Sequence, residues 1–442
     1  MPPGHPLLVR LPCPVITYML TNTEIVDMVT DIKTGRVFLD HLIQKHLDHA
    51  DIVEETEMDF ELPEELRILR QEVRKFALRE MAPIAQECDR EEHYPREVWK
   101  KACEQGLVGA WIPEAYGGPG GGFLANALIA EEMCRIDMGL ALCIGAATFG
   151  SENILLYGSE EQKQTYLPRL VNGEIIFAGA YTEPNAGTDV AGIKTRAVLD
   201  GDHFVLNGSK MFITNGTICD YMVVFCVTNP DAPRHERFSL LIVDAGTPGI
   251  TRTKIKGKMG IRASDTAELA FEDVRVPVEN LVGKQGRGFY QLMDFFNTTR
   301  TMVAAQGVGL AQGALDKAVQ YVQERHAFGQ PLAGFQAVQT QLAEMATRIE
   351  LTRHLTYKAA WQVDLGKIDP KLSAMAKYYS GEMAVWVVDK AVQLHGGYGY
   401  IDEYDVQRFY RDAKILEIYE GTKEAEKLTI AKGLLKEYAR QT

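Results

Sequence analysis

Apolar residues near the start of the globular part of the chain repeat at helical spacing. After Met58, the residues Leu66, Leu69, Val73 and Phe76 recur every three or four positions, behind an acidic first turn that favours the start of a helix. Further segments with a helical pattern follow, separated by a glycine-rich stretch that is typical of a loop. The sequence therefore predicts an N-terminal helical domain over residues 58–176.

The pattern changes near Ile176, where the apolar segments become short. Residues 200–216 contain one Asp-Gly and two Asn-Gly turn signals, and the segments 220–228, 237–245 and 267–277 are rich in Val, Ile and Phe at strand length. These features predict a middle β domain over residues 177–286.

Long helical patterns return after Phe289. They cover residues 297–325, 335–366 and 370–394, and their many small and apolar residues suit close packing between helices. We therefore expect a C-terminal helical domain over residues 287–442. Residues 1–57 form an extension of unknown role; within it, His41, His46 and His49 are expected on the solvated face of a short helix rather than at a metal, because no acidic residue or Cys stands at a matching spacing.

Composition and charge exclude several classes of protein. The chain has 442 residues and a net charge of −13, which argues against nucleic acid or an anionic membrane surface as the main partner. No apolar run is long enough to span a bilayer. Seven scattered cysteines, none spaced Cys-x-x-Cys, suit reduced thiols in a cytosol-like compartment. We expect the protein in the bacterial cytoplasm, or in the mitochondrial matrix of a eukaryote, without a bound metal.

Several motifs occur in a fixed order around the predicted β domain. They are "YTEPNAGTDVAG" (181–192), "KMFITNG" (210–216), "GIRASDTAELAFEDVRVP" (260–277), "RHAFGQPL" (325–332) and "LHGGYGYIDEYDVQRFYRDAKILEIYEGT" (394–422). Together they resemble the acyl-CoA dehydrogenase family, and the resemblance extends from Met58 to Lys427. It implies an α+β multidomain fold with an N-terminal helical domain, a middle β-barrel-like domain and a C-terminal four-helix bundle.

The resemblance also implies the chemistry. Members are FAD-dependent oxidoreductases acting on CH–CH donors: they convert an acyl-CoA thioester to its 2,3-enoyl form and pass electrons to an electron-transferring flavoprotein. They are usually homotetramers. Two alternatives remain open from the residues: a catalytically inactive member that acts as an assembly scaffold, and an acyl-CoA oxidase that returns electrons to oxygen.

One carboxylate stands out in "IYEGT", because Glu420 follows apolar residues and precedes a Gly-Thr pair. Removing a weakly acidic α-proton requires a base whose ionised form is disfavoured by burial, and a hydrogen-bond donor for the thioester oxygen. Considered alone, Glu420 is better interpreted as a surface glutamate that caps a helix. The resemblance implies that Glu420 is the catalytic base and that its backbone N–H is one oxyanion donor.

The resemblance further implies the cofactor and substrate contacts. Those expected at FAD are Tyr181, Thr182, Gly187, Thr188, Phe212, Thr214, Arg325, Phe328, Gln393, Gly397 and Thr422, of which Arg325, Phe328, Gln393 and Gly397 match residues that reach the FAD of a neighbouring subunit. Those expected at the substrate are Thr188, Asn297, Arg300, Tyr419 and Gly421.

The size of the acyl group is predicted from one further stretch. "LCIGAATFG" (Leu142–Gly150) matches the segment that lines the far end of the acyl site, and its residues are small and partly polar. Small residues leave room for width, although the same residues also suit helix packing. We expect a short or compact acyl group, whether branched, cyclic or dicarboxylic.

Overall fold

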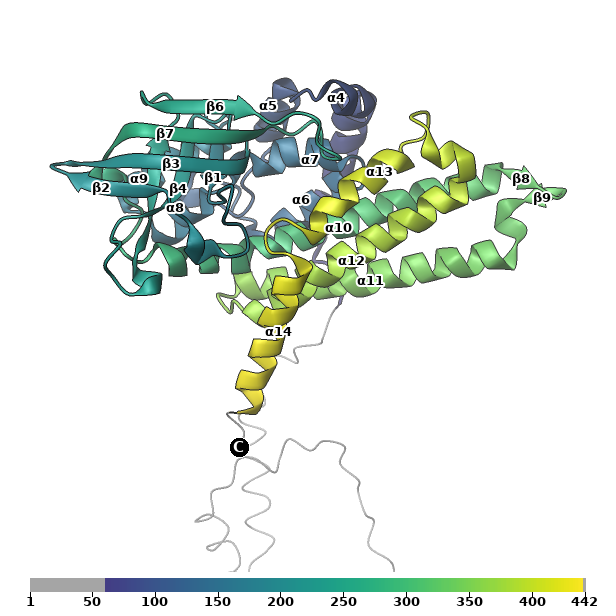
Figure 1. Ribbon diagram of the computed structural model, residues 1–442. Helices are drawn as coiled ribbons and strands as arrows, with labels where there is room; N and C mark the ends of the chain where they lie inside the picture. Colours follow the sequence, from purple (N-terminus) through teal and green to yellow (C-terminus); the bar gives the residue numbers. More distant parts are fainter. Residues whose placement is uncertain (1–59, 440–442) are drawn as a thin grey trace, which may run out of the picture. The chain divides into compact units, whose positions relative to one another are not determined.

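The computed structural model describes residues 60–439 (Figure 1). The chain divides into two units, residues 1–62 and 63–442, and all the elements below belong to the second. His41, His46 and His49 lie outside the described residues. The helices are α3 (Glu64–Phe76), α4 (Ala85–Glu91), α5 (Arg96–Glu104), α6 (Gly122–Cys134), α7 (Met138–Gly145), α8 (Glu152–Tyr157), α9 (Glu160–Val171), α10 (Gly288–Glu324), α11 (Gln336–Asp364), α12 (Pro370–His395), α13 (Val406–Ala413) and α14 (Lys423–Tyr438). The strands are β1 (Phe177–Ala180), β2 (Arg196–Asp200), β3 (His203–Thr214), β4 (Tyr221–Val227), β5 (Phe238–Asp244), β6 (Ile250–Lys254), β7 (Thr266–Pro277), β8 (His326–Ala327) and β9 (Gln330–Pro331).

The first helix, α3, begins and ends as its charges favour. Glu64 and Glu65 lie in its first turn and Arg74 in its last, where each charge complements the helix dipole. On the side facing α6, Arg74 Nε donates to Glu132 Oε2 over 2.7 Å and Arg70 Nε donates to Glu132 Oε1 over 2.8 Å. The carboxylate of Glu132 is buried but fully paired, so these bonds tie α3 to the helices behind it.

The middle domain is a seven-stranded, mixed sheet. Its strand order is β1-β4-β2-β3-β7-β6, and β5 pairs with β4. The long strands β3 and β7 are antiparallel, with register irregularities between Leu206 and Gly208 and between Lys210 and Ile213. The second irregularity places Phe212 on a bulge with a positive φ of 60°, and a bulge of this kind turns a side chain out of the strand's alternation.

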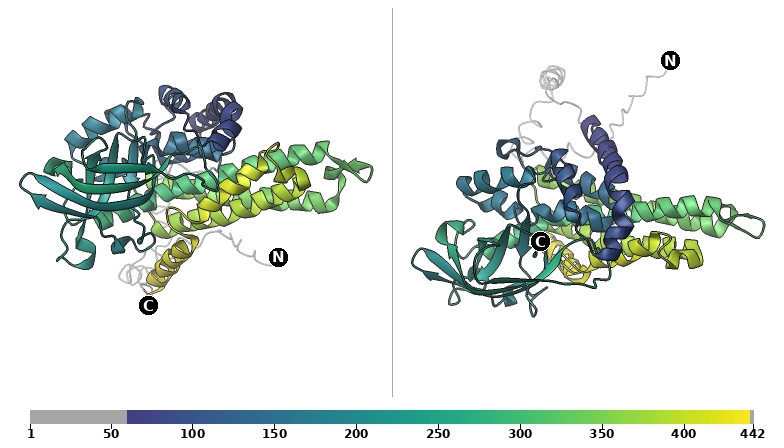
Figure 2. Two further views of the ribbon diagram at one scale, coloured as in Figure 1. Left: turned by 45° about the horizontal axis from the view of Figure 1, so that its top comes forward. Right: turned by 90° about the horizontal axis from the view of Figure 1, so that it is seen from above.

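Three long helices form the core of the C-terminal domain. In every view of Figures 1 and 2, α10, α11 and α12 run side by side, and α14 packs against α12. Close packing depends on small residues: a Cβ at Gly309 of α10 would lie 2.0 Å from the carbonyl oxygen of Glu131 in α6, so α10 and α6 approach as closely as glycine allows.

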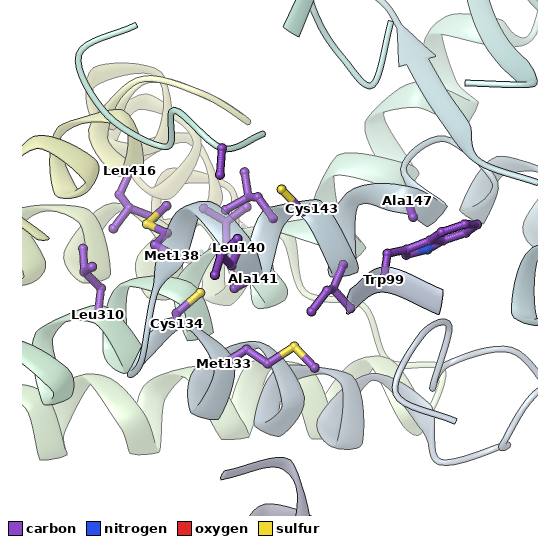
Figure 3. Close-up of a cluster of buried hydrophobic side chains, with 14 of the residues drawn as sticks. Trp99, Met133, Cys134, Met138, Leu140, Ala141, Cys143, Ala147, Leu310 and Leu416 are labelled. Carbon is purple, nitrogen blue, oxygen red and sulfur yellow. The ribbon is translucent and has the colours of Figure 1, made fainter. Parts of the chain in front are cut away.

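The largest core connects the N-terminal helices to the bundle and the sheet. Figure 3 shows part of it around α7, where Met138 and Leu140 lie near Leu310 of α10 and Leu416 of the turn before Glu420. The fold class is therefore confirmed: helical, then β, then helical, in the arrangement expected from the sequence.

Two features of the described residues bear on other classes of protein. The stretch Met138–Tyr157 is long and apolar enough to cross a membrane by composition, but most of it is buried in the core just described. Within residues 60–439, no group of His, Cys, Asp and Glu side chains is arranged to hold a metal ion. The six cysteines in that part of the chain are free and buried.

Candidate active site

Glu420 lies in a tight turn between the 3-10 turn Lys414–Glu417 and α14. Its own φ is 55° and that of Gly421 is 107°, both in the left-handed region. A Cβ at Gly421 would lie 2.0 Å from Oε1 of Glu426, so the turn accepts only glycine there. A positive φ at a residue other than glycine is uncommon and is often found at functional sites, and here that residue is Glu420.

The carboxyl of Glu420 is poised to take up a proton near neutral pH. Burial raises its pKa from 4.5 to about 7, against the opposing effects of a hydrogen bond from Thr299 and the charges of Arg300 and Lys377. Thr299 Oγ1 donates to Glu420 Oε2 over 2.7 Å. Because no described residue donates to Oε1, that oxygen is the one available to a substrate proton.

Side chains of α10 and α12 bind the backbone of the same turn through hydrogen bonds. Arg300 Nε donates to the carbonyl oxygen of Glu420 over 3.2 Å, and Lys377 Nζ donates to that of Gly421. Both carbonyls therefore point into the protein. The N–H of Glu420 donates to no described residue, which leaves it available as a donor to a ligand.

A second layer of charge lies beneath the turn. Arg300 Nη2 lies 3.0 Å from Glu426 Oε1, and Arg300 Nη1 donates to Asn297 Oδ1 over 2.9 Å. Asn297, expected at the substrate, thus orients Arg300. Burial lowers the pKa of Lys377 to about 8, although the nearby carboxylates of Glu426 and Glu420 oppose this. Neither Lys377 nor Glu426 was anticipated from the sequence.

Aromatic rings cluster around the start of α10, the helix that carries Thr299. Phe149, Tyr181, Phe295 and Phe296 pack on one another with ring centroids 5.3–6.0 Å apart, and Asn153 Nδ2 donates to the Tyr181 hydroxyl over 3.0 Å. These rings come from the loop before α8, the end of β1 and the start of α10, so they bring the predicted acyl segment next to the helix that carries Thr299.

The predicted acyl segment itself presents both open space and a buried acid. A Cβ at Gly145 would meet no atom within 4 Å, so the chain leaves room beside this residue. Glu152 is buried, accepts a hydrogen bond from the N–H of Gly150 over 2.9 Å, and has its pKa raised to about 8, first by burial and in part by the charge of Glu420. Two acidic side chains thus share one poorly solvated region.

The residues expected at the flavin ring lie together. The N–H of Met211 donates to the Thr182 carbonyl over 2.9 Å, and this bond joins the motif at 181–192 to that at 210–216. Phe212 stands on the bulge of β3 with 66% of its surface exposed, and Thr182 and Thr214 are half-buried beside it. Gly187 has no atom within 4 Å of a built Cβ, and Thr188 is exposed.

Another group of expected cofactor contacts lies far from Glu420. Arg325, Gln393 and Gly397 line a cleft of about 390 Å³ at the other end of the bundle. At about 1.5 Å per helical residue, the α10 axis carries Arg325 about 39 Å from Thr299. Phe328, which is 97% exposed, is not among the residues that line the cleft. One chain therefore does not bring all the expected contacts to one place.

Two expected residues already have partners within the chain. Thr422 is the N-cap of α14, and its hydroxyl accepts from the N–H of Ala425 over 3.3 Å. The Tyr419 hydroxyl donates to Gln306 Oε1 over 2.5 Å, which fixes the ring beside Glu420.

Comparison with known proteins identifies the family. The N-terminal, middle and C-terminal domain models of acyl-CoA dehydrogenase match residues 63–174, 178–274 and 286–435. The chain belongs to the acyl-CoA dehydrogenase family. It is therefore an enzyme, an oxidoreductase acting on CH–CH donors, and a flavoprotein that uses FAD.

Individual relatives match over most of their length. The chain is 45% identical to "Acryloyl-CoA reductase (NADH)" of Anaerotignum propionicum, over 86% of this chain and 96% of that protein. Butyryl-CoA dehydrogenase of Megasphaera elsdenii superposes with a TM-score of 0.83 at 40% identity, over 86% of this chain and 100% of that one. A chain in a structure described as "Electron transferring flavoprotein of Acidaminococcus fermentans" superposes with a TM-score of 0.84 at 42% identity, over the same shares.

The surfaces described above fit FAD. A flat, exposed ring at Phe212, open space at Gly187 and Gly397, and an exposed Arg325 suit an isoalloxazine ring, a close backbone approach and a pyrophosphate, respectively.

Proposed function

We propose that this enzyme oxidises a short or compact acyl-CoA to the 2,3-enoyl-CoA, with Glu420 as the catalytic base. The observation that supports this most directly is the free Oε1 of Glu420, on a carboxyl whose pKa is about 7. At neutral pH about half of such carboxyls are ionised, so the group can accept a proton and later release it. The hydrogen bond from Thr299 keeps Oε2 occupied and so directs the proton to Oε1.

Each residue of the site has its own role in the proposed reaction. Glu420 Oε1 takes the proton from Cα, and the electrons of that C–H bond form the Cα=Cβ double bond while hydride leaves Cβ. Bound FAD supplies the acceptor for that hydride. The free N–H of Glu420 donates to the thioester oxygen as charge develops there. Tyr419, Gly421, Arg300 and Asn297 contribute by fixing the turn rather than by direct chemistry.

We propose that Tyr181, Thr182, Gly187, Phe212 and Thr214 hold the flavin ring of the same subunit. Thr188, exposed at the same edge, is placed to contact either FAD or the CoA part of the substrate. Thr422 contributes through the start of α14, because its hydroxyl already caps that helix.

The homotetramer is part of this proposal. Arg325 lies about 39 Å along α10 from Thr299, and Gln393 and Gly397 line the same cleft as Arg325. These residues are therefore too far from Glu420 to contact the flavin beside it in the same chain, and the exposed Phe328 follows Arg325 closely in sequence. A neighbouring copy that presents this end of its bundle would complete the cofactor site. We propose an electron-transferring flavoprotein as the acceptor of electrons and the cytoplasm as the location; the structural likeness to a chain from such a flavoprotein study supports the first.

Replacement of Glu420 by Gln tests the proposed function. Adding butyryl-CoA anaerobically to the yellow holoenzyme should bleach the flavin of the wild type. Glu420→Gln should retain FAD and lower the rate of bleaching by about 10²- to 10⁴-fold, because it removes the base and keeps the shape. Glu424→Gln, an exposed neighbour in the first turn of α14, is the matched control and should bleach normally. Normal bleaching by Glu420→Gln, or none by the wild type with any acyl-CoA, would refute the proposal.

A second candidate is the same reaction in reverse, since a relative is named an NADH-dependent acryloyl-CoA reductase. Glu420 would then deliver its proton to Cα. Oxidation of NADH on addition of acryloyl-CoA, compared with dye reduction on addition of propionyl-CoA, distinguishes the two directions. The inactive-scaffold alternative predicts neither signal, and the oxidase alternative predicts peroxide in air.

A further inference from the structure

The carboxylate of Glu426 is unusual among the buried acids of the described residues. It is fully buried in α14, its Oε1 lies 3.0 Å from Arg300 Nη2, and yet neither of its oxygens has a hydrogen bond from a described residue. The buried Glu132 and Glu183, in contrast, each accept two or more hydrogen bonds. A buried carboxylate without hydrogen bonds is costly, so its place beneath the Glu420 turn calls for an explanation.

The contacts of the turn indicate what Glu426 does there. Arg300 holds the carbonyl of Glu420 and Lys377 holds that of Gly421, so two cations lie directly behind the base. Glu426 meets Arg300 and faces Lys377, whose ammonium it stabilises by its charge. Its Oε1 also fills the space that a side chain at position 421 would occupy. Glu426 of α14 thus pairs with Arg300 of α10, and α14 packs against α12, the helix that carries Lys377 (Figure 1).

We propose that Glu426 is a positioning residue for the base: it holds Arg300 and Lys377 against the Glu420–Gly421 turn and offsets their positive charge. Without that negative charge, the cations of Arg300 and Lys377 would stabilise the ionised form of Glu420. The base would then give up its proton more readily and accept one less readily. The inference rests on the proposed role of Glu420 and adds a group that, besides burial, strengthens the binding of a proton by Glu420.

Other titratable groups also face Glu420. From α8 comes Glu152, which shares the poorly solvated region, and from the end of β1 comes Tyr181, whose pKa is raised by burial and by both carboxyls. Tyr419 adjoins Glu420 in the chain and donates its proton to Gln306. None of these three meets Arg300 or Lys377 in an ion pair among the described residues, so they do not replace Glu426 in balancing the cations.

The test compares the pH dependence of kcat/KM in three variants. At low pH, kcat/KM falls because Glu420 becomes protonated; this part of the profile is its acid limb. Glu426→Gln keeps the shape of the side chain and removes its charge, and should move the acid limb to lower pH by about one unit. Lys377→Met should move it up, because it removes a cation. The double variant Lys377→Met/Glu426→Gln loses one charge of each sign and should return the limb close to that of the wild type. Glu131→Gln is the matched control: Glu131 is a buried acid paired with Arg353, and its loss should leave the limb in place.

A role for Glu426 in folding alone predicts a different result. All variants would then lose activity or stability without a shift of the acid limb, and Lys377→Met would not reverse the effect of Glu426→Gln. If Glu426→Gln fails to fold, the single Lys377→Met and the double variant still decide: equal limbs in these two would overturn the proposal.

A second measurement separates this inference from the proposed function. The difference in melting temperature between Glu420 and Glu420→Gln proteins, followed against pH, reports the proton affinity of Glu420 without turnover. In the Glu426→Gln background, the midpoint of that difference should also fall by about one pH unit. A shifted midpoint in a protein that dehydrogenates no acyl-CoA would refute the proposed function and leave this inference standing. An unshifted midpoint in an active enzyme would refute this inference and leave the proposed function standing.

Discussion

Glu420→Gln should stabilise the folded enzyme, and the gain should depend on pH. The pKa of Glu420 is about 7 in the folded protein, against an ordinary value of 4.5. The folded state therefore holds this proton more tightly than the unfolded state does. The stability from this group is complete below pH 4.5 and is lost as pH rises to about 7. Glutamine, which does not titrate, escapes that loss.

The size of the effect follows from the shift. Each pKa unit corresponds to about 1.4 kcal/mol, so the shift corresponds to about 3 kcal/mol once Glu420 is fully ionised. For a folded unit of this size, with an unfolding entropy of about 2 cal/mol/K per residue, 3 kcal/mol is about 4 °C in melting temperature. Compared with the wild type, Glu420→Gln should thus gain little at pH 4.5 and about 4 °C at pH 8.

Scanning fluorimetry of the FAD-loaded proteins between pH 4.5 and 8.5 measures this directly. The flavin content of both proteins must be equal, because a bound cofactor raises the melting temperature by itself. A difference that stays constant over this range would refute the reasoning, since it would mean that Glu420 titrates alike in the folded and unfolded chain.

Three other outcomes are expected. Glu183→Gln should show the opposite sign: the charge of Lys210 and hydrogen bonds hold the pKa of Glu183 below its usual range despite burial, so the variant should lose stability at pH 7 and approach the wild type only as pH falls below 4.5, in thermal scans extended into that range. Arg325→Ala should release FAD on dilution and reduce the oligomer seen by light scattering, whereas Arg275→Ala, an exposed arginine of the sheet, should change neither. Gly145→Leu should fill the open space at Gly145 and lower kcat/KM severalfold more for octanoyl-CoA than for butyryl-CoA, at about 0.8 kcal/mol per methylene excluded; equal losses would place the acyl chain elsewhere.

The sequence was informative where chemistry restricts the residue type. A carboxylate between apolar residues and Gly-Thr is rare enough to attract attention, and burial does raise the pKa of Glu420 as the required chemistry suggests. The change of period near Ile176 likewise marks the start of the sheet, because strands and helices bury their side chains at different spacings.

The supporting residues could not be found in the same way. Thr299 is an ordinary helical threonine until the fold brings it to Glu420, 121 positions later in the chain. Glu426 reads as one more acid in a charged helix start. The sequence around Lys377 gives a weak signal of a special role, because this lysine of α12 is flanked by small and apolar residues. Nothing in the local sequence shows that Lys377 contacts the carbonyl of Gly421. Such pairs are set by tertiary packing, which periodicity does not encode.

The length of α10 imposes a condition on any exchange of parts between this enzyme and its relatives. One rigid helix carries Thr299 and Arg300 near its start and leads directly into Arg325 at its end. Deleting one residue between them would shorten the span by about 1.5 Å and turn the far end by about 100° relative to the near end. Thr299 could then no longer meet Glu420 while Arg325 lines the cleft with Gln393. A working chimera must therefore keep this helix in phase, residue for residue, even where its sequence is free to vary.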